Sequence, residues 1–190
     1  MGKKEDLRVV KTKASLYRGL LNLMKKKPFE NIKVSEICSI SLINRSTFYD
    51  HFNDKFELLE SMLSDMRIEL INSFNDKSFN GSPNERYEQN IRILLDHIEQ
   101  NKEFYSAVTK INGNSIAKDM LTDAIVASAL KDSQKKFSKG DVPSRTFVLF
   151  YASGFIAIIL DALRDIKTFS KDDIVNTLIA FLPDMNTNKK

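Results

Sequence analysis

Apolar side chains recur along most of the chain at the three-to-four-residue spacing of amphipathic helices. The clearest stripe lies in residues 7–26 and consists of Val10, Ala14, Tyr17, Leu21 and Met24. Similar patterns predict helices over residues 34–41, 54–74, 85–100, 102–110, 115–137, 144–164 and 170–182. No segment keeps the two-residue alternation of a strand, so we predict an all-α fold with about nine helices.

The stretch from Asn44 to Phe52 has two unlike faces. Phe48 and Phe52 are four residues apart, so they lie on one helical face and pack inward. The rest of the segment is crowded with hydrogen-bonding side chains: Arg45, Ser46, Thr47, Tyr49 and His51. A short helix of this kind suits insertion into a DNA groove, and we expect the side chain of Asn44 to cap its start.

The neighbouring segments complete a helix-turn-helix. The helix over residues 34–41 buries Ile37 and Cys38, and residues 42–43 form the turn. Asp54 and Glu57 have the D-x-x-E spacing of a capping box, which begins the next helix. The second of these three helices is then the recognition helix.

Residues 32–38 and 43–55 resemble the DNA-binding half of the TetR family of one-component transcriptional regulators. The T-F-Y-x-H-F-x-D-K run at residues 47–55 is highly specific for that family. The resemblance is clear over residues 8–60 and is one of helical organisation beyond them. It implies a three-helix DNA-binding head over residues 1–55 and a helical-bundle body for effector binding and dimerisation over residues 56–190. The residues expected to contact DNA are Lys33, Val34, Ser35, Asn44, Arg45, Ser46, Thr47, Tyr49, His51 and Lys55.

These positions have different expected roles. Arg45 is a candidate for bidentate contact with guanine, with the hydroxyl residues beside it at base edges. Tyr49, His51 and Lys55 match family positions that meet the phosphate backbone, although packing under the helix is the rival role for Tyr49. Lys25, Lys26 and Lys27 at the end of the first helix are read as a solvated cluster.

Two departures from the family pattern affect the motif. Leu42 occupies the turn position that the family usually gives to glycine, so the turn must tolerate a branched residue. Lys33 stands where a threonine commonly caps the first helix of the motif. Ser35 is then a weaker cap, or that end is frayed until phosphate binds.

Charge and composition agree with a DNA-binding head. Residues 1–55 hold 12 Lys or Arg against 6 Asp or Glu, and the rest holds 17 against 19, so a basic third precedes a slightly acidic body. The single cysteine, Cys38, reads as a small buried residue and suits a reducing cytoplasm. No signal peptide is recognised at Met1, and the apolar run of residues 147–160 is too short to span a membrane.

Catalytic, metal and cofactor sites are not indicated. The two histidines are His51, in the DNA-reading run, and His97, which reads as a surface or partly buried residue. There is no H-E-x-x-H, no glycine-rich phosphate loop and no nucleophile elbow. We therefore expect no enzyme activity and no cofactor.

The body supplies aromatic residues for an effector pocket, although core packing is the alternative for each one. The pocket candidates are Phe104, Tyr105, Phe147, Phe150 and Tyr151. Nothing in the sequence identifies the small molecule.

The helices over residues 144–164 and 170–182 are the most apolar consecutive pair and are expected to form a two-fold, four-helix interface. The interface candidates are Ala152, Phe155, Ile158, Ile159, Ile174, Leu178 and Phe181. The alternative is that residues 147–160 form the central helix of a monomer. The expected function is a homodimeric repressor released from palindromic double-stranded DNA by an effector. An effector-independent DNA-binding protein, or an activator with a protein partner, is the alternative.

Overall fold

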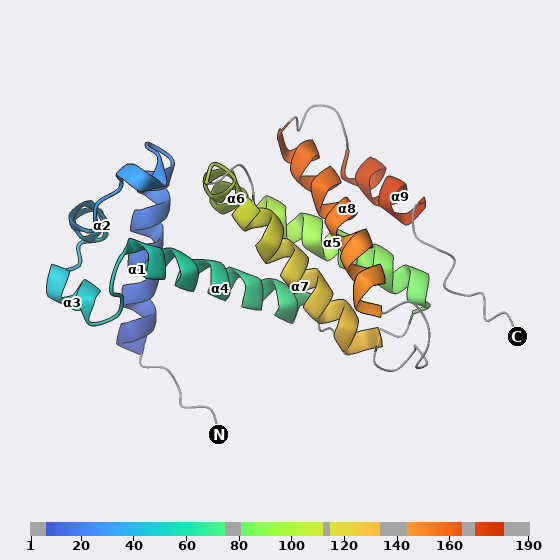
Figure 1. Ribbon diagram of the computed structural model, residues 1–190, viewed down its shortest axis with the longest axis horizontal. Coiled ribbons are helices and arrows are strands. Elements are labelled where there is room, and N and C mark those ends of the chain that lie inside the picture. Colours follow the sequence, from blue (N-terminus) through green and yellow to red (C-terminus); the bar gives the residue numbers. More distant parts are fainter. Residues whose placement is uncertain (1–6, 75–80, 112–114, 134–143, 165–169, 181–190) are drawn as a thin grey trace, which may run out of the picture. The chain divides into compact units, whose positions relative to one another are not determined.

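The computed structural model describes residues 7–74, 81–111, 115–133, 144–164 and 170–180. All regular structure in these ranges is helical, with nine α-helices and one 3-10 turn, which confirms the predicted all-α class (Figure 1). The chain divides into two compact units, Met1–Met66 with Glu103–Ile116 and Arg67–Lys102 with Ala117–Lys190. The functional division between residues 55 and 56 stays a prediction, because these units are defined by packing.

The first unit contains α1 (Leu7–Met24), η1 (Phe29–Asn31), α2 (Val34–Ser41), α3 (Arg45–Tyr49), the first part of α4 (Lys55–Phe74) and most of α6 (Lys102–Val108). Its core joins side chains from four helices that are wholly buried: Leu16, Leu20, Ile37, Phe48 and Leu58. Ile37 and Phe48 face inward, as predicted. The buried face of α1 differs from the predicted stripe, because Leu16 and Leu20 are buried whereas Val10 and Ala14 are exposed. The first helix ends at Met24, two residues earlier than predicted, and a turn leads to Pro28.

Gly19 allows α1 and α2 to lie very close together. A Cβ atom at this position would overlap Ser41 Oγ and would lie 2.9 Å from Cγ2 of Ile40 and 3.3 Å from the carbonyl oxygen of Ile37. Those distances are shorter than ordinary van der Waals contact, so any side chain here would push α2 away from α1. The lack of a side chain at Gly19 therefore helps to set the position of α2, the first helix of the helix-turn-helix, against α1.

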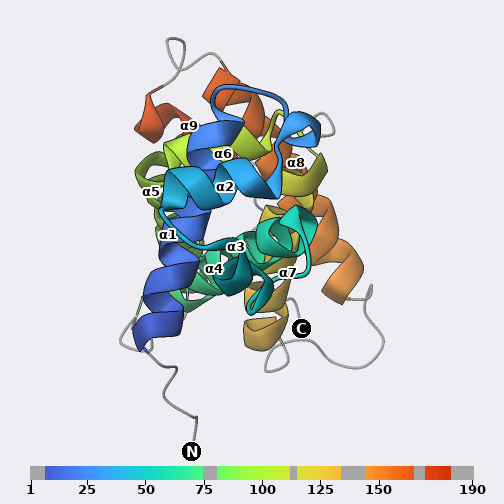
Figure 2. The ribbon, with the colours of Figure 1, turned by 90° about the vertical axis from the view of Figure 1, so that its left-hand side faces the viewer.

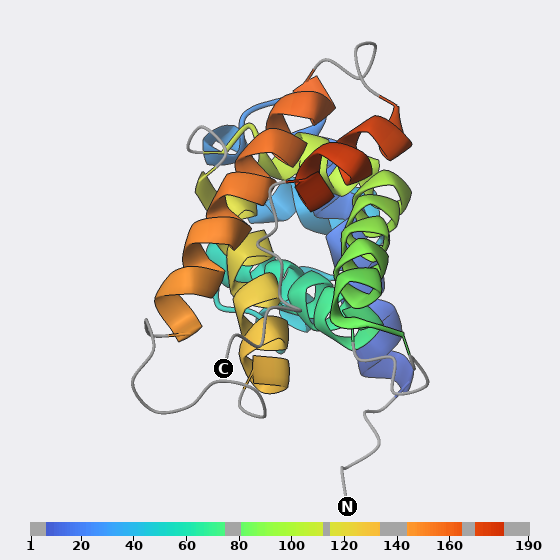
Figure 3. The same ribbon diagram turned by 90° about the vertical axis from the view of Figure 1, so that its right-hand side faces the viewer.

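The second unit contains the end of α4, α5 (Pro83–Gln100), most of α7 (Ser115–Ser133), α8 (Ser144–Arg164) and α9 (Lys171–Ala180). Helix α9 packs against α5, as Figure 3 shows. Two ion-pair groups join these helices: Arg92 with Asp172 at 2.8 Å, and Lys171 with both Asp96 and Glu99. The predicted extensions of two helices beyond residues 133 and 180 lie outside the described residues.

Two helix starts in the second unit have reciprocal caps. Asp173 N donates to Ser170 Oγ at 3.1 Å and Ser170 N donates to Asp173 Oδ2 at 3.1 Å, the two bonds of a capping box. Helix α5 begins at residue 83 instead of the expected 85. The reason is that Ser82 and Glu85 form the same box, with bonds of 3.3 and 2.6 Å, and Pro83 occupies the first turn.

Candidate nucleic-acid interface

The turn between α2 and α3 has the hydrogen bonds of a Schellman motif. Ile43 N donates to the carbonyl of Cys38 at 3.0 Å, and Leu42 N donates to the carbonyl of Ser39 at 3.3 Å. Leu42 lies in the left-handed region, with φ 55° and ψ 37°. It is the only residue other than glycine with positive φ in the described part of the chain. The family's usual glycine is thus replaced by a leucine that adopts the glycine conformation.

Phe48 in α3 and Phe52, three residues after the end of that helix, both pack inward, as predicted. Phe48 is fully buried and Phe52 is 4% exposed, with ring centroids 5.9 Å apart. The predicted DNA-contacting side chains follow the opposite pattern, because Asn44, Arg45 and Ser46 are exposed. Figure 2 shows α2 and α3 side by side on one face of the first unit.

The remaining predicted residues of this segment are more varied. Tyr49 is half exposed, whereas Thr47 is only partly exposed. His51 lies in the turn after α3, because that helix ends at Tyr49. Asn44 occupies the N-cap position but its side chain makes no cap hydrogen bond, contrary to the prediction. Its amide is therefore an exposed group at the start of α3.

The start of α2 is held by Glu36. Its Oε2 accepts from Lys33 N at 2.9 Å, and its carboxylate accepts from Lys27 Nζ at 2.7 Å. The Lys27 bond, followed by the Lys33 N–H bond, lowers the pKa of Glu36. The N-terminal end of α2 is therefore held by the Glu36 carboxylate. The sequence had predicted a weak cap by Ser35 or a frayed end. Lys33 and Ser35 are exposed, and Val34 is partly exposed.

Lys55 makes contacts within the protein that the sequence did not predict, and its phosphate contact stays a prediction. Its ammonium donates to the carbonyl oxygens of Phe29 at 3.0 Å, Glu30 at 2.7 Å and Ile32 at 2.9 Å. It also lies 4.9 Å from the ring centroid of Phe29 and 5.4 Å from that of Phe56. An ammonium group has three N–H donors. All three are engaged within the protein, so Lys55 fastens η1 to the start of α4.

The capping box at the start of α4 is also altered. Asp54 Oδ1 accepts from the N–H groups of Phe56 and Glu57, as expected. The Glu57 carboxylate, however, accepts from Asn53 N at 2.7 Å and from Asn53 Nδ2 at 2.8 Å. The reciprocal bond of the capping box thus comes from Asn53 N and not from Asp54 N. It helps to hold the segment between α3 and α4 in place.

Tyr17 connects α1 to α4. Its hydroxyl oxygen lies 2.7 Å from Ser61 Oγ and donates to Asp65 Oδ2 at 2.7 Å. The sequence placed Tyr17 on the apolar stripe of the first helix but gave no partner for its hydroxyl. These hydrogen bonds help to hold α1, which packs behind the helix-turn-helix, against α4, which follows it.

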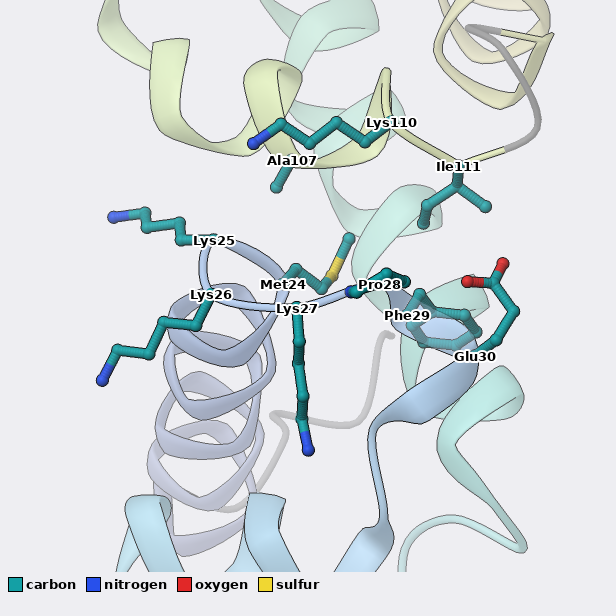
Figure 4. A pocket seen from close by; sticks show the side chains of 10 residues that line it. All are labelled: Met24, Lys25, Lys26, Lys27, Pro28, Phe29, Glu30, Ala107, Lys110 and Ile111. Atoms are coloured by element: carbon teal, nitrogen blue, oxygen red, sulfur yellow. The ribbon is translucent and has the colours of Figure 1, made fainter.

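A pocket of about 260 Å³ lies within the first unit, between the ends of α1 and α6. Figure 4 shows Met24 and Ile111 facing the gap, with the ammonium groups of Lys25, Lys26 and Lys110 on one side. The C-terminal ends of helices favour cations. In addition, Lys25 pairs with Glu103 at 2.6 Å. Lys26 is exposed at the helix end, as the solvated-cluster prediction supposed, whereas Lys25 and Lys27 each form an ion pair.

The predicted effector aromatics do not share one environment. Phe104 and Tyr105 are 3% and 1% exposed and meet edge to face at 5.2 Å, within the first unit. Tyr151 is partly exposed, and Phe150 is 73% exposed on α8 in the second unit. A side chain as open as Phe150 does not line an enclosed pocket of a single chain. The side chain of Phe147 lies outside those described.

The predicted interface residues divide between the two faces of their helices. Ala152, Ile159 and Leu178 are buried inside the second unit, so they are core residues and not available surface. Ile158 is 40% exposed, and Phe155 and Ile174 are partly exposed, whereas Phe181 lies outside the described residues. The outward face of α8 instead carries Leu149, Phe150, Gly154, Ala157 and Ile158.

Two other titratable residues are buried. Cys38 is 4% exposed, and burial raises the pKa of its thiol, which agrees with a packing role. His97 is 5% exposed, and burial lowers its pKa, although the carboxylate of Glu69, 4.0 Å from Nδ1, acts in the opposite direction. The described residues contain no cluster of three metal-binding side chains and no helix long and apolar enough to cross a membrane.

An exposed recognition helix on a small all-α head, followed by a larger helical unit, defines a helix-turn-helix DNA-binding regulator. The family model for the TetR-type "Transcriptional regulator C-terminal region" matches residues 85–184. The chain belongs to the TetR family of transcriptional regulators.

Relatives and solved structures agree with this assignment. The "HTH-type dhaKLM operon transcriptional activator DhaS" of Lactococcus lactis is 27% identical over 176 residues, which cover 89% of each chain. The uncharacterized regulator YxbF of Bacillus subtilis is 38% identical over 98 residues, 49% of this chain but only 25% of YxbF. A TetR-family regulator from Syntrophomonas wolfei has the same fold, with a TM-score of 0.69, 21% identity and coverage of 90% and 92% of the two chains.

Proposed function

We propose that this DNA-binding regulator acts as a two-fold homodimer that reads a palindromic operator with α3. The observation that carries this proposal is the arrangement of α3, where Asn44, Arg45 and Ser46 are exposed while Phe48 and Phe52 hold the helix in the core. Arginine and asparagine side chains form bidentate hydrogen bonds with guanine and adenine, respectively. A single recognition helix reads only a short half-site, which favours a dimer.

Arg45 provides the test of readout. A duplex selected by the wild-type protein from a pool of randomised sequence serves as the probe. Arg45→Ala should weaken binding to that duplex by about 1–3 kcal/mol and relax the preference at one base pair. Arg18→Ala, an exposed arginine on α1, is the matched control. Unchanged affinity and unchanged preference for Arg45→Ala would remove Arg45 from the readout.

The outward face of α8 supports a dimer contact. Phe150, Leu149 and Ile158 are 73%, 41% and 40% exposed in the single chain. Gly154 lies among them, and a Cβ atom there would meet nothing within 4 Å. Glycine inside a helix is unfavourable by about 0.5–1 kcal/mol relative to alanine, and packing against the described residues does not require it. A partner helix that approaches closely at Gly154 would explain both the glycine and the exposed apolar side chains.

The assembly is tested by sedimentation. The wild-type protein should sediment with the mass of two chains, and Gly154→Gln should reduce it to one chain while leaving the helical circular dichroism intact. Ala127→Gln, at an exposed position of α7, is the control and should remain dimeric. A wild-type protein that sediments as one chain at micromolar concentration and binds a single half-site would refute the dimer.

Regulation is proposed to follow from a small molecule that binds the body and favours one spacing of the two heads. This requires different effector affinities for the two spacings. Repression released by the effector is the first candidate. Activation, with a protein partner or without an effector, is the second, because the relative DhaS is named a transcriptional activator. Transcription in vitro from a promoter that carries the selected duplex distinguishes the two signs.

A further inference from the structure

Leu42 occupies a position that is unfavourable for its residue type. Its backbone has φ 55° and ψ 37°, a region where the Cβ atom of an L-residue is crowded and glycine is not. The two turn bonds from Leu42 N and Ile43 N use only backbone atoms, so glycine would make the same turn. The backbone therefore gives no reason for a leucine here.

The side chain of Leu42 also contributes almost nothing to the core. It is 92% exposed, which is the largest exposure of any large hydrophobic residue in the described part of the chain. An exposed branched apolar residue with an unfavourable backbone is a local conflict between sequence and fold. Such conflicts concentrate at functional sites.

The location of Leu42 indicates what would cover it. It lies two residues before Asn44, the N-cap of α3, and the turn is on the same face of the first unit as α3 (Figure 2). The exposed residues that follow are Asn44, Arg45 and Ser46, the proposed base-reading group. When α3 lies against DNA, the turn that leads into it is brought to the edge of the duplex.

We infer that the Leu42 side chain packs against an apolar part of the DNA half-site. This inference rests on the proposed reading of DNA by α3. DNA offers two apolar surfaces of this kind, the C5-methyl group of thymine in the major groove and the carbon atoms of deoxyribose. Either surface would exclude water from a side chain that the free protein leaves in solvent. Leu42 is thus a specificity or positioning contact that hydrogen-bonding patterns do not reveal.

Leu42→Gly separates binding from folding, because the two effects have opposite signs. The variant should unfold at a higher urea concentration than the wild type, because glycine relieves the left-handed conformation. It should bind the selected duplex about fivefold more weakly, as expected when half of a leucine side chain is no longer covered. The slope of affinity against salt concentration should not change, since no charge is removed.

Two further arms identify the apolar surface. Single thymine-to-uracil replacements in the selected duplex remove one methyl group at a time. If one replacement weakens the wild type but not Leu42→Gly, the contact is that methyl group. If no replacement does so while Leu42→Gly remains weaker, the contact is deoxyribose. Ile68→Asn, which alters a half-exposed isoleucine on α4, should bind as the wild type does.

Equal affinity of Leu42→Gly and wild type for the selected duplex would overturn the inference and would favour a protein partner on this turn. A lower unfolding midpoint for Leu42→Gly would also overturn it, because Leu42 would then be a packing residue. If the wild-type protein selects no duplex at all, the proposed function fails first, which is a distinguishable result.

Discussion

Lys55 offers the sharpest separation between two roles for one residue. A phosphate-binding lysine and a lysine that holds the fold together respond differently when the ammonium group is removed. Lys55→Met keeps the apolar stem and deletes the three donors to the carbonyls of residues 29, 30 and 32. Folding stability and the salt dependence of DNA binding then report the two roles independently.

The stability loss can be worked from the three carbonyl groups. The Glu30 carbonyl is exposed and can bind water instead, and the Phe29 carbonyl keeps a bond from Ile32 N at 3.1 Å. The part-buried Ile32 carbonyl loses the Lys55 bond, which costs about 1–3 kcal/mol. The lost attraction to the two phenylalanine rings adds about 0.5–1 kcal/mol. We expect Lys55→Met to lower the free energy of unfolding by about 1.5–4 kcal/mol.

The assay pairs urea unfolding with DNA binding at several salt concentrations, using the selected duplex. Lys55→Met should shift the unfolding midpoint and leave the salt slope unchanged. Lys33→Met is the matched control, because Lys33 is exposed at the start of α2. It should lower the slope by about one and leave stability unchanged. A slope that falls by about one in Lys55→Met, with wild-type stability, would refute the structural role.

Three other substitutions probe packing and titration. Gly19→Ala should destabilise the protein by about 1–3 kcal/mol in urea unfolding, because the new methyl group overlaps Ser41 on α2; an unchanged midpoint would contradict this close approach. Because burial lowers the pKa of His97, the unfolded state takes up the proton first, so stability should fall as the pH drops below about 6.5. His97→Gln should flatten that fall, and an equally steep pH profile would show that Glu69 or another group is responsible. Tyr17→Phe should lose about 0.5–1.5 kcal/mol through its missing bonds to α4, and wild-type stability would show that the tie contributes nothing.

The helices were predictable because their signals are local. The apolar period of α1, the proline that follows it and the box formed by Ser170 and Asp173 all lie within a few residues of the feature they determine. The S-x-x-E signal at Ser82 was equally local, and attention to it would have placed the start of α5 correctly. Anchoring of α3 by Phe48 and Phe52 followed from their spacing alone.

The sequence was ambiguous where a side chain has two possible partners. Lys55 lies in a run that indicates DNA binding, but its partners are backbone carbonyls 23 to 26 residues earlier in the chain. Every residue has a carbonyl, so the sequence cannot show which of them accept a hydrogen bond. The α8 segment is apolar on nearly every side, so its period cannot show which face is turned outward. That is why Ala152 and Ile159 were expected at an interface but lie in the core, whereas Phe150 was expected in a pocket but is exposed.

The first unit is not continuous in the sequence, and this has a consequence for synthesis. Residues 103–116 belong to the same unit as residues 1–66, although all of α5 is translated between them. On the ribosome, α1 to α3 emerge first, without the ion pair from Glu103 to Lys25 and without Ile111 beside the end of α1. The DNA-binding head therefore completes its packing only after about a third of the second unit has also been made. A fragment that stops at Phe74 would carry every DNA-reading residue and still lack part of the structure that supports them.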